Sequence, residues 1–232
     1  YVLNKLGMRV MGDIGCYTLA ALPPLSAMDA CLCMGASIGM AGGAERAQGK
    51  AFSRGTVAVL GDSTFIHSGI TSLIDAVYNR ETITVVILDN RITGMTGHQQ
   101  NPATGYDIHN QPAPQLNLEK LVESCGVTDV RVVDPFNLKA TEQAIREAAA
   151  SEQVSVVIAR RPCALLKYVK HKAPLKVNTD KCIGCKSCMK IGCPAISIKE
   201  GKAHVDNTLC VGCGVCEQLC PVSAFESTGK EG

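Results

Sequence analysis

Eight of the thirteen cysteines fall in two runs of almost the same spacing near the end of the sequence. The first run reads Cys182-x2-Cys185-x2-Cys188-x4-Cys193-Pro194, and the second reads Cys210-x2-Cys213-x2-Cys216-x3-Cys220-Pro221. Runs of this kind hold two [4Fe–4S] clusters, because three cysteines of a run bind one cluster and the cysteine before the proline binds the other. The sequence therefore predicts a carrier of single electrons.

The crossing rule takes the four ligands of each cluster from both runs. The first set is Cys182, Cys185, Cys188 and Cys220, and the second set is Cys210, Cys213, Cys216 and Cys193. The first run has four residues before its last cysteine, where the common spacing is three. We interpret the extra residue as a bulge in which Gly192 takes an unusual backbone angle.

Two other uses of cysteine fit the runs less well. A zinc site closes with four ligands and does not need a third cysteine at Cys-x2-Cys-x2-Cys. A disulfide framework is typical of secreted chains, and no secretory segment precedes these residues. The other five cysteines, Cys16, Cys31, Cys33, Cys125 and Cys163, show no pairing pattern, and we expect most of them to be small buried side chains.

Composition excludes several classes of function. The 232 residues carry a net charge of +2, no Trp and 4% aromatic residues, which indicates neither a nucleic acid nor a membrane as partner. The longest apolar stretch, residues 30–44, is too short and too rich in glycine to cross a bilayer. We expect a cytoplasmic protein and, because the sequence begins at Tyr1 without an initiator Met, a fragment of something longer.

Strands and helices alternate through the first two-thirds of the sequence. Apolar, β-branched segments predict strands at residues 56–60, 82–89, 130–134 and 154–160, and helical spacing predicts helices at 69–78, 118–125 and 138–151. Apolar strands joined by helices predict an open, mostly parallel α/β sheet sandwiched by helices. We expect this domain to span residues 1–173, with a basic linker at 161–173, and a small α+β two-cluster ferredoxin domain to span 174–232.

Four shorter features carry further expectations. Residues 90–115 have no sustained period and predict a long loop at the carboxyl end of a central strand, where open α/β sheets bind ligands. Gly35, Gly39 and Gly43 share a helical face, which favours close packing over ligand contact. The basic linker is either a solvated connector, which we favour, or a dock for an acidic partner. Residues 195–198 and 203–205 predict a hairpin.

Polar residues follow two of the predicted strands. Gly61-Asp62-Ser63 ends one strand, and Asn90 ends the next, 28 positions after Asp62. The carboxyl ends of neighbouring parallel strands lie together, so a carboxylate and an amide oxygen can share one hard cation. The pattern resembles the metal–diphosphate motif of thiamine diphosphate enzymes, with Ser63 and Arg91 where that motif has its second Gly and second Asn.

The resemblance extends beyond this motif. Asp13-Ile14-Gly15-Cys16-Tyr17, Gly61-Asp62-Ser63-Thr64-Phe65-x-His67-Ser68-Gly69 and Asp89-Asn90-x2-Thr93-x-Met95-Thr96-Gly97-x-Gln99 are similar to 2-oxoacid:ferredoxin oxidoreductases. A two-cluster ferredoxin segment directly after the thiamine domain, and the x4 gap, resemble the indolepyruvate-oxidising branch of that family. The resemblance covers essentially the whole chain.

The resemblance implies oxidative decarboxylation of an arylpyruvate to an acyl-coenzyme A, with electrons passed through both clusters to an external ferredoxin. Asp62, Asn90 and the Ile92 carbonyl would bind Mg²⁺. Gly61, Ser63, Thr64 and Gly94 would complete the thiamine diphosphate site. Cys16 would lie near the thiazolium, or be a buried thiol, and His67 would contact the diphosphate or line the substrate pocket.

One catalytic part is missing from the sequence. The glutamate that activates thiamine belongs to a pyrimidine-binding domain, which the family's alpha subunit carries N-terminal to this region. We therefore expect that domain and a beta subunit as partners. Two alternatives stay open, namely the same chemistry on pyruvate or 2-oxoglutarate, and an electron-transfer module on an inactive α/β scaffold.

Overall fold

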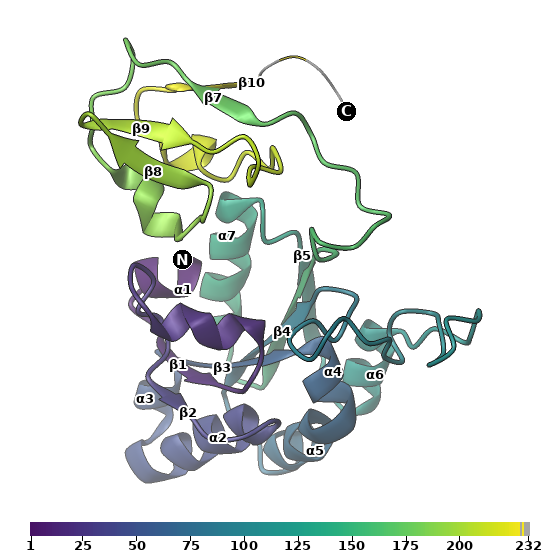
Figure 1. Cartoon of the computed structure of the whole chain (residues 1–232). Helices are drawn as coiled ribbons and strands as arrows, with labels where there is room; N and C mark the ends of the chain where they lie inside the picture. Colours follow the sequence, from purple (N-terminus) through teal and green to yellow (C-terminus); the bar gives the residue numbers. More distant parts are fainter. Residues whose placement is uncertain (228, 230–232) are drawn as a thin grey trace. The chain divides into compact units, whose positions relative to one another are not determined.

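The computed structural model describes residues 1–227 and residue 229. The chain divides into two compact units (Figure 1). The α/β unit comprises residues 2–21 and 27–163, and the cysteine-rich unit comprises residues 1 and 22–26 and the chain from residue 164 onward. The division between Cys163 and Ala164 falls inside the predicted linker of residues 161–173. The predicted boundary between the two domains after residue 173 stays a prediction.

A six-stranded parallel sheet forms the α/β unit, in the order β2-β1-β3-β4-β6-β5. The strands are β1 (Arg9–Gly12), β2 (Ala30–Cys31), β3 (Thr56–Gly61), β4 (Thr84–Asp89), β5 (Asp129–Val133) and β6 (Ser155–Arg160). The expected open parallel sheet is confirmed. Sequence patterns did not predict β1 and β2, which are short and lack an apolar run.

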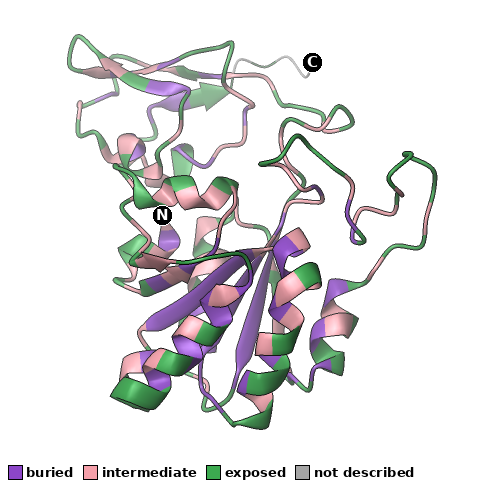
Figure 2. Cartoon of the chain, turned by 60° about the horizontal axis from the view of Figure 1, so that its bottom comes forward, coloured by how far each residue is buried: buried purple, intermediate pink, exposed green. Residues whose placement is uncertain are grey.

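The central strands lie buried between two layers of helices (Figure 2). The helices are α1 (Val2–Lys5), α2 (Ala36–Gln48), α3 (Lys50–Ser53), α4 (Asp62–Thr64), α5 (Ile70–Tyr78), α6 (Leu118–Ser124) and α7 (Leu138–Ala149). Helix α2 packs against α5, and α1 packs against α7. Because β3-to-β4 and β5-to-β6 cross the sheet in opposite directions, right-handed crossovers place α5 and α7 on opposite faces.

Local sequence explains where several helices begin. The side chains of Asn117 and Asn137 accept the N–H groups of Lys120 and Ala140, and so cap α6 and α7. The predicted helix at residues 69–78 starts earlier than expected. Helix α4 begins directly at Asp62 and continues through a π-helical segment, η2 (Phe65–Gly69), into α5.

The expected packing of the glycine face on α2 is wrong for two of its three members. A Cβ at Gly39 or Gly43 would meet nothing within 4 Å, whereas one at Gly35 would clash with Ser68. The helix packs closely through Gly42 instead, whose Cβ would stand 2.2 Å from a carboxylate oxygen of Glu81. The buried stripe therefore lies one position away from the glycine repeat.

The cysteine-rich unit contains two small antiparallel pairs. Strand β7 (Leu175–Val177) pairs with β10 (Phe225–Ser227), and β8 (Ile196–Lys199) pairs with β9 (Lys202–Val205). The second pair confirms the predicted hairpin. Each cysteine run also contains a 3-10 helix, η3 (Ser187–Ile191) in the first and η4 (Glu217–Leu219) in the second. Gly192 ends η3 with φ of 69°, as the bulge interpretation expected.

Candidate functional site

Asp62 lies at the carboxyl end of β3 and is 2% exposed. One carboxylate oxygen accepts the N–H of Ser63 at 2.8 Å, and the other accepts the side-chain amide of Asn101 at 3.4 Å. Burial raises the pKa of Asp62 to about 6, and the charge of Asp89 adds to the rise against the hydrogen bond from Ser63. The fold thus holds a carboxylate where a cation would be strongly stabilised.

The start of the long loop after β4 brings three of the predicted residues together. The side-chain oxygen of Asn90 accepts the N–H of Ile92 at 3.1 Å, which forms a tight turn. A Cβ at Gly94 would stand 3.5 Å from Cys16 Sγ and 3.8 Å from Asn90 Nδ2. Cys16, which begins the 3-10 helix η1 (Cys16–Ala21) after β1, therefore faces the same turn as Asn90. Gly94 leaves space at this point that any side chain would fill.

These residues fit a magnesium–diphosphate group. Asp62 and Asn90 follow adjacent parallel strands, β3 and β4, so their oxygen-bearing side chains lie at one edge of the sheet. Oxygen ligands of this type suit Mg²⁺, which keeps part of its shell for phosphate and water. Ser63 lies on the first turn of the helical segment that begins at Asp62, where backbone N–H groups favour anions.

Sequence reasoning missed Asn101, whose side-chain amide contacts the carboxylate of Asp62. Asn101 is 7% exposed, and its side-chain amide lies 3.4 Å from both Asp62 Oδ2 and Thr93 Oγ1. It comes from the middle of the loop of residues 90–115, where no pattern distinguished it. The hydroxyl of Tyr17 was also missed, although it accepts the N–H of Gly61 at 3.1 Å and so fixes the turn before Asp62.

The described contacts of His67 and Thr64 are with residues other than the predicted metal ligands. His67 is exposed in η2, and its Nδ1 lies 2.5 Å from Ser68 Oγ. Thr64 is buried, and its side chain hydrogen-bonds Tyr17. The described contacts do not join His67 to Asp62 or Asn90, so its role in substrate or diphosphate binding stays a prediction.

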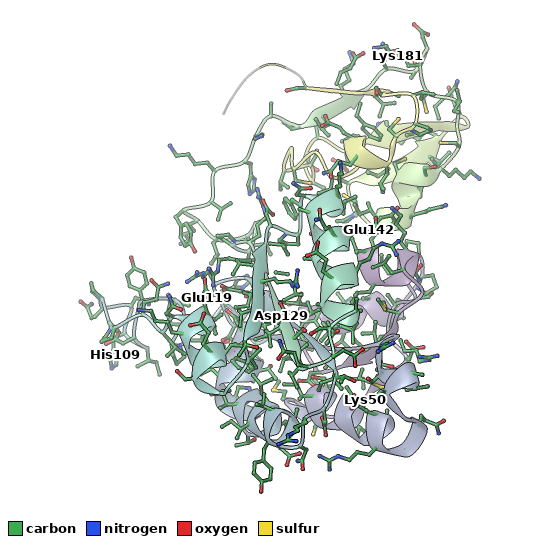
Figure 3. The ribbon with its side chains drawn as sticks, turned by 180° about the vertical axis from the view of Figure 1, so that it is seen from behind. Lys50, His109, Glu119, Asp129, Glu142 and Lys181 are labelled. Carbon is green, nitrogen blue, oxygen red and sulfur yellow. The ribbon has the colours of Figure 1, made fainter. Side chains whose placement is uncertain are left out.

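A network of charged side chains holds the start of the loop of residues 90–115 against the end of β4. Asp89, at the end of β4, forms ion pairs with Arg91 at 3.3 Å and with Arg160 at 2.6 Å. Arg160 also pairs at 2.7 Å with both oxygens of Glu119, and this pairing lowers the pKa of Glu119 to about 2. Glu119 lies on α6 (Figure 3). Arg91 donates in addition to the carbonyl of Ala103 at 3.0 Å. The arginine in place of the motif's second Asn thus ties the loop to β4.

The first set of cysteines lines one small cavity in the cysteine-rich unit. Its walls contain all four predicted ligands of that set, together with apolar side chains such as Ile198 and Phe225. Backbone N–H groups of Ala203 and Ala224 donate to the sulfurs of Cys182 and Cys220 at 3.5 and 3.2 Å. A cavity of thiols with N–H donors to sulfur fits a [4Fe–4S] cluster.

The four cysteines of the second set also lie close together, although no cavity lined by all four is described. Burial raises the pKa of Cys216 to about 12, and three neighbouring thiolates add to the rise, namely those of Cys213, Cys193 and Cys210. These are the partners that the crossing rule predicts. The backbone N–H of Leu175 donates to Cys210 Sγ at 3.4 Å. Within the described residues no three His, Cys, Asp or Glu side chains are grouped as on a single metal ion.

The remaining cysteines correct one expectation. We expected most of the five thiols outside the runs to be buried, but only Cys125 is. Cys16 and Cys33 are exposed, and Cys31 and Cys163 are half-buried. The error arose because these thiols lie in loops and at strand ends, whereas Cys125 ends α6 against the core.

Two protein families match parts of the chain. Residues 13–159 match the family "Thiamine pyrophosphate enzyme, C-terminal TPP binding domain", and residues 203–226, which include the second run, match the "4Fe-4S binding domain" family. The chain therefore belongs to the thiamine pyrophosphate enzymes and carries a ferredoxin-type segment. A solved 2-oxoglutarate:ferredoxin oxidoreductase from Magnetococcus marinus has the same fold, with a TM-score of 0.60 and 18% identity over 71% of this chain and 57% of that one.

Within that class the chain is a member of the indolepyruvate oxidoreductase IorA subunit family. It is 43% identical to subunit IorA of Pyrococcus abyssi, over 95% of this chain and 37% of that protein. The corresponding subunit of Methanothermobacter marburgensis is 42% identical, over 94% of this chain and 35% of that protein. The chain thus spans little more than a third of these relatives. Among the described residues, no helix is both long and apolar enough to cross a membrane.

Proposed function

We propose that this chain is the thiamine-binding and electron-carrying part of an enzyme that oxidises arylpyruvates. The observation that carries the proposal is that one chain contains both an edge site with a buried Asp62 and a half-buried Asn90, and two converging sets of four cysteines. The names of the IorA relatives support indolepyruvate as substrate. Because the chain spans only part of those relatives, the complete activity requires further protein.

The overall reaction balances with one-electron acceptors. The bond between the carboxyl and keto carbons breaks and releases CO₂, and a thioester bond to coenzyme A forms. The two electrons released would pass one at a time to two molecules of oxidised ferredoxin, and the thiol proton goes to solvent. The eight cysteines would hold the two [4Fe–4S] clusters that supply this one-electron transfer. A carrier with cysteine-bound clusters is suited to divide an electron pair in this way.

The chain's own residues would hold and orient the cofactor. Bound thiamine diphosphate supplies a nucleophilic carbon and an electron sink for decarboxylation. Asp62 and Asn90 would bind Mg²⁺, with the carbonyl of Ile92, and Ser63 and Thr64 would contact the diphosphate. Cys16 faces the turn at Gly94, so it would lie beside the reactive ring rather than inside the protein core. His67 would line the outer part of the pocket.

The isolated chain should bind clusters but should not oxidise substrate. The glutamate that activates thiamine belongs to a pyrimidine-binding domain, and we infer that this domain and a beta subunit complete the enzyme. Supplying the pyrimidine-binding domain should restore reduction of an artificial acceptor such as methyl viologen. Substrate oxidation at a normal rate by the isolated 232 residues would contradict this assignment.

The substrate class can be tested on the assembled enzyme. We expect kcat/KM for indolepyruvate to exceed that for pyruvate by about tenfold or more, because a pocket built for an aryl group loses apolar contact with a methyl group. The measurement is the initial rate of viologen reduction with indolepyruvate, phenylpyruvate, pyruvate and 2-oxoglutarate. A preference for pyruvate or 2-oxoglutarate would keep the chemistry and reject the arylpyruvate assignment.

A further inference from the structure

The two cysteine sets differ in the charge of the chain around them. Six lysines and two acidic residues lie between residues 175 and 202, which contain the first run. Between residues 203 and 227, which contain the second run, there is no Lys or Arg and there are three acidic residues. In sequence, the segment that contains the first run is therefore basic, and the segment that contains the second run is acidic.

Contacts at the cysteines show the same difference. Lys190 interacts electrostatically with Cys185, whose Sγ lies 3.5 Å from Ser187 Oγ. The ammonium group of Lys202 donates to the carbonyl of Cys182. In the second set the charged neighbour of Cys216 is Glu217, the next residue in the chain.

The surface over the first set is open and has an apolar centre. Cys185 is exposed, and Ile183, which lines the cavity of the first set, is 64% exposed. Lys186 and Lys190 are also exposed, and both follow Cys185 in sequence, one on each side of Ser187. We call the surface formed by Ile183, Cys185, Lys186 and Lys190 the Lys186 face. An apolar centre with a charged rim is the usual pattern of a small, transient protein interface.

Hydrogen bonding to sulfur favours the first set as the place where an electron rests. Backbone N–H groups reach Cys182 and Cys220, and Cys185 Sγ lies 3.5 Å from Ser187 Oγ. In the second set the N–H of Leu175 donates to Cys210 and the backbone N–H groups of Ala195 and Ile196 reach Cys193, so the described contacts involve two of its four sulfurs, against three in the first set. More donors to sulfur and more positive charge both raise the potential of a cluster. An electron shared between the clusters would therefore favour the first.

The second set lies where the chain enters the unit. Gly212, between Cys210 and Cys213, is in tight contact with the backbone of Lys172 and Ala173, so a Cβ at Gly212 would clash with both. These residues belong to the linker that follows the α/β unit in sequence. This contact lies within the cysteine-rich unit, and it places the linker beside the second set rather than the first.

We propose that the cluster at the first set is the electron exit and that the Lys186 face docks an acidic one-electron carrier protein. The inference rests on the proposed cluster binding but not on the proposed thiamine chemistry. Opposite charges on the two partners would increase the association rate and orient the carrier over Ile183. Lys181, the residue before Cys182, lies at the surface of the cysteine-rich unit (Figure 3) and pairs with Glu226 at 2.9 Å; it would extend the basic rim.

The test uses the whole chain with its clusters reduced by dithionite, so that no thiamine step is involved. Flavodoxin, an acidic one-electron carrier, is the probe, and its reduction is followed by stopped-flow flavin absorbance. We expect the paired change Lys186→Glu and Lys190→Glu to lower the second-order rate constant about tenfold or more at low ionic strength. The difference should shrink as salt screens the charges. Cytochrome c, a basic acceptor, should show no such loss.

The matched control reverses two linker charges, Lys170→Glu and Lys172→Glu, and should leave the rate with flavodoxin within about twofold of the unaltered chain. Iron content is measured first on every variant. If the Lys186 face variant loses iron, two other measurements test the docking surface, namely the rate of Lys190→Glu alone and the salt dependence of the rate of the unaltered chain. A rate of flavodoxin reduction by the unaltered chain that does not fall as salt is added overturns the proposal. Equal slowing by both paired variants, or slowing by the linker pair alone, also overturns it and places docking on the linker.

Discussion

Changing Asp62 to Asn is expected to reduce the affinity for Mg²⁺–thiamine diphosphate by about 100-fold or more while making the folded chain more stable. Asn preserves shape but removes the charge that a hard cation requires. Burial raises the pKa of Asp62 to about 6, so the ionised carboxylate destabilises the metal-free fold at neutral pH. With 1.36 kcal/mol per pKa unit, the gain on removing that charge is about 1 to 3 kcal/mol.

The pH dependence follows from the same raised pKa. Below about pH 6 the carboxyl group becomes protonated in the folded chain, so its cost to stability disappears as the pH falls toward 4. The stability difference between Asp62→Asn and the unaltered chain should therefore be large at pH 7 and small near pH 4. Urea unfolding of the metal-free α/β unit, followed by far-ultraviolet circular dichroism, measures this difference.

Asp75→Asn is the matched control for this experiment. Asp75 is also on the helical segment after β3, but it is exposed and pairs at the surface with Arg46 at 3.2 Å. This change should affect neither cofactor binding nor stability by more than about 0.5 kcal/mol. Calorimetric titration with thiamine diphosphate and Mg²⁺, with the pyrimidine-binding domain supplied, gives the affinity. Unchanged affinity in Asp62→Asn would remove Asp62 from the metal site.

Paired cysteine changes should show that each cluster takes ligands from both runs. Cys182→Ser with Cys220→Ser changes two ligands of the first set, so the chain should keep about four of about eight irons, the number two [4Fe–4S] clusters require. Cys182→Ser with Cys193→Ser changes one ligand of each set, although both residues lie in the first run. This pair should lose nearly all the iron. Iron analysis with electron paramagnetic resonance of the reduced chain measures both.

Cys33→Ser provides the control for the cysteine pairs, because Cys33 is exposed in the α/β unit and outside both runs. It should keep about eight irons. The opposite pattern, in which Cys182→Ser with Cys193→Ser keeps about four irons, would mean that each run binds its own cluster. The cavity that joins Cys220 to Cys182, Cys185 and Cys188 argues for the crossed arrangement.

Sequence patterns predicted the parts of the fold that depend on residues close together in the sequence. The fully buried strands β3, β4 and β6 are continuous apolar runs, which only a sheet covered on both faces requires. The hairpin β8–β9 has Glu200 and Gly201 at positive φ, which suits the two-residue turn between its strands. The cysteine runs were equally readable, because their spacing reflects the geometry of a cluster.

The rest depends on contacts between residues distant in sequence. Asn101 reaches Asp62 only because the loop of residues 90–115 folds back over the sheet edge, and no local pattern encodes that path. The short strands β1 and β2 are stabilised by pairing with longer neighbours. Gly39 and Gly43 repeat at helical spacing, yet the orientation of α2 places Gly42 against Glu81 instead.

The central claim is that the thiamine site and the clusters act in one electron path. The most direct measurement is the anaerobic absorbance of the clusters when indolepyruvate is added to the chain assembled with its pyrimidine-binding domain, Mg²⁺, thiamine diphosphate and coenzyme A. Our account predicts bleaching that requires thiamine diphosphate and is lost in Asp62→Asn. Release of CO₂ without bleaching, or bleaching without thiamine diphosphate, would contradict it.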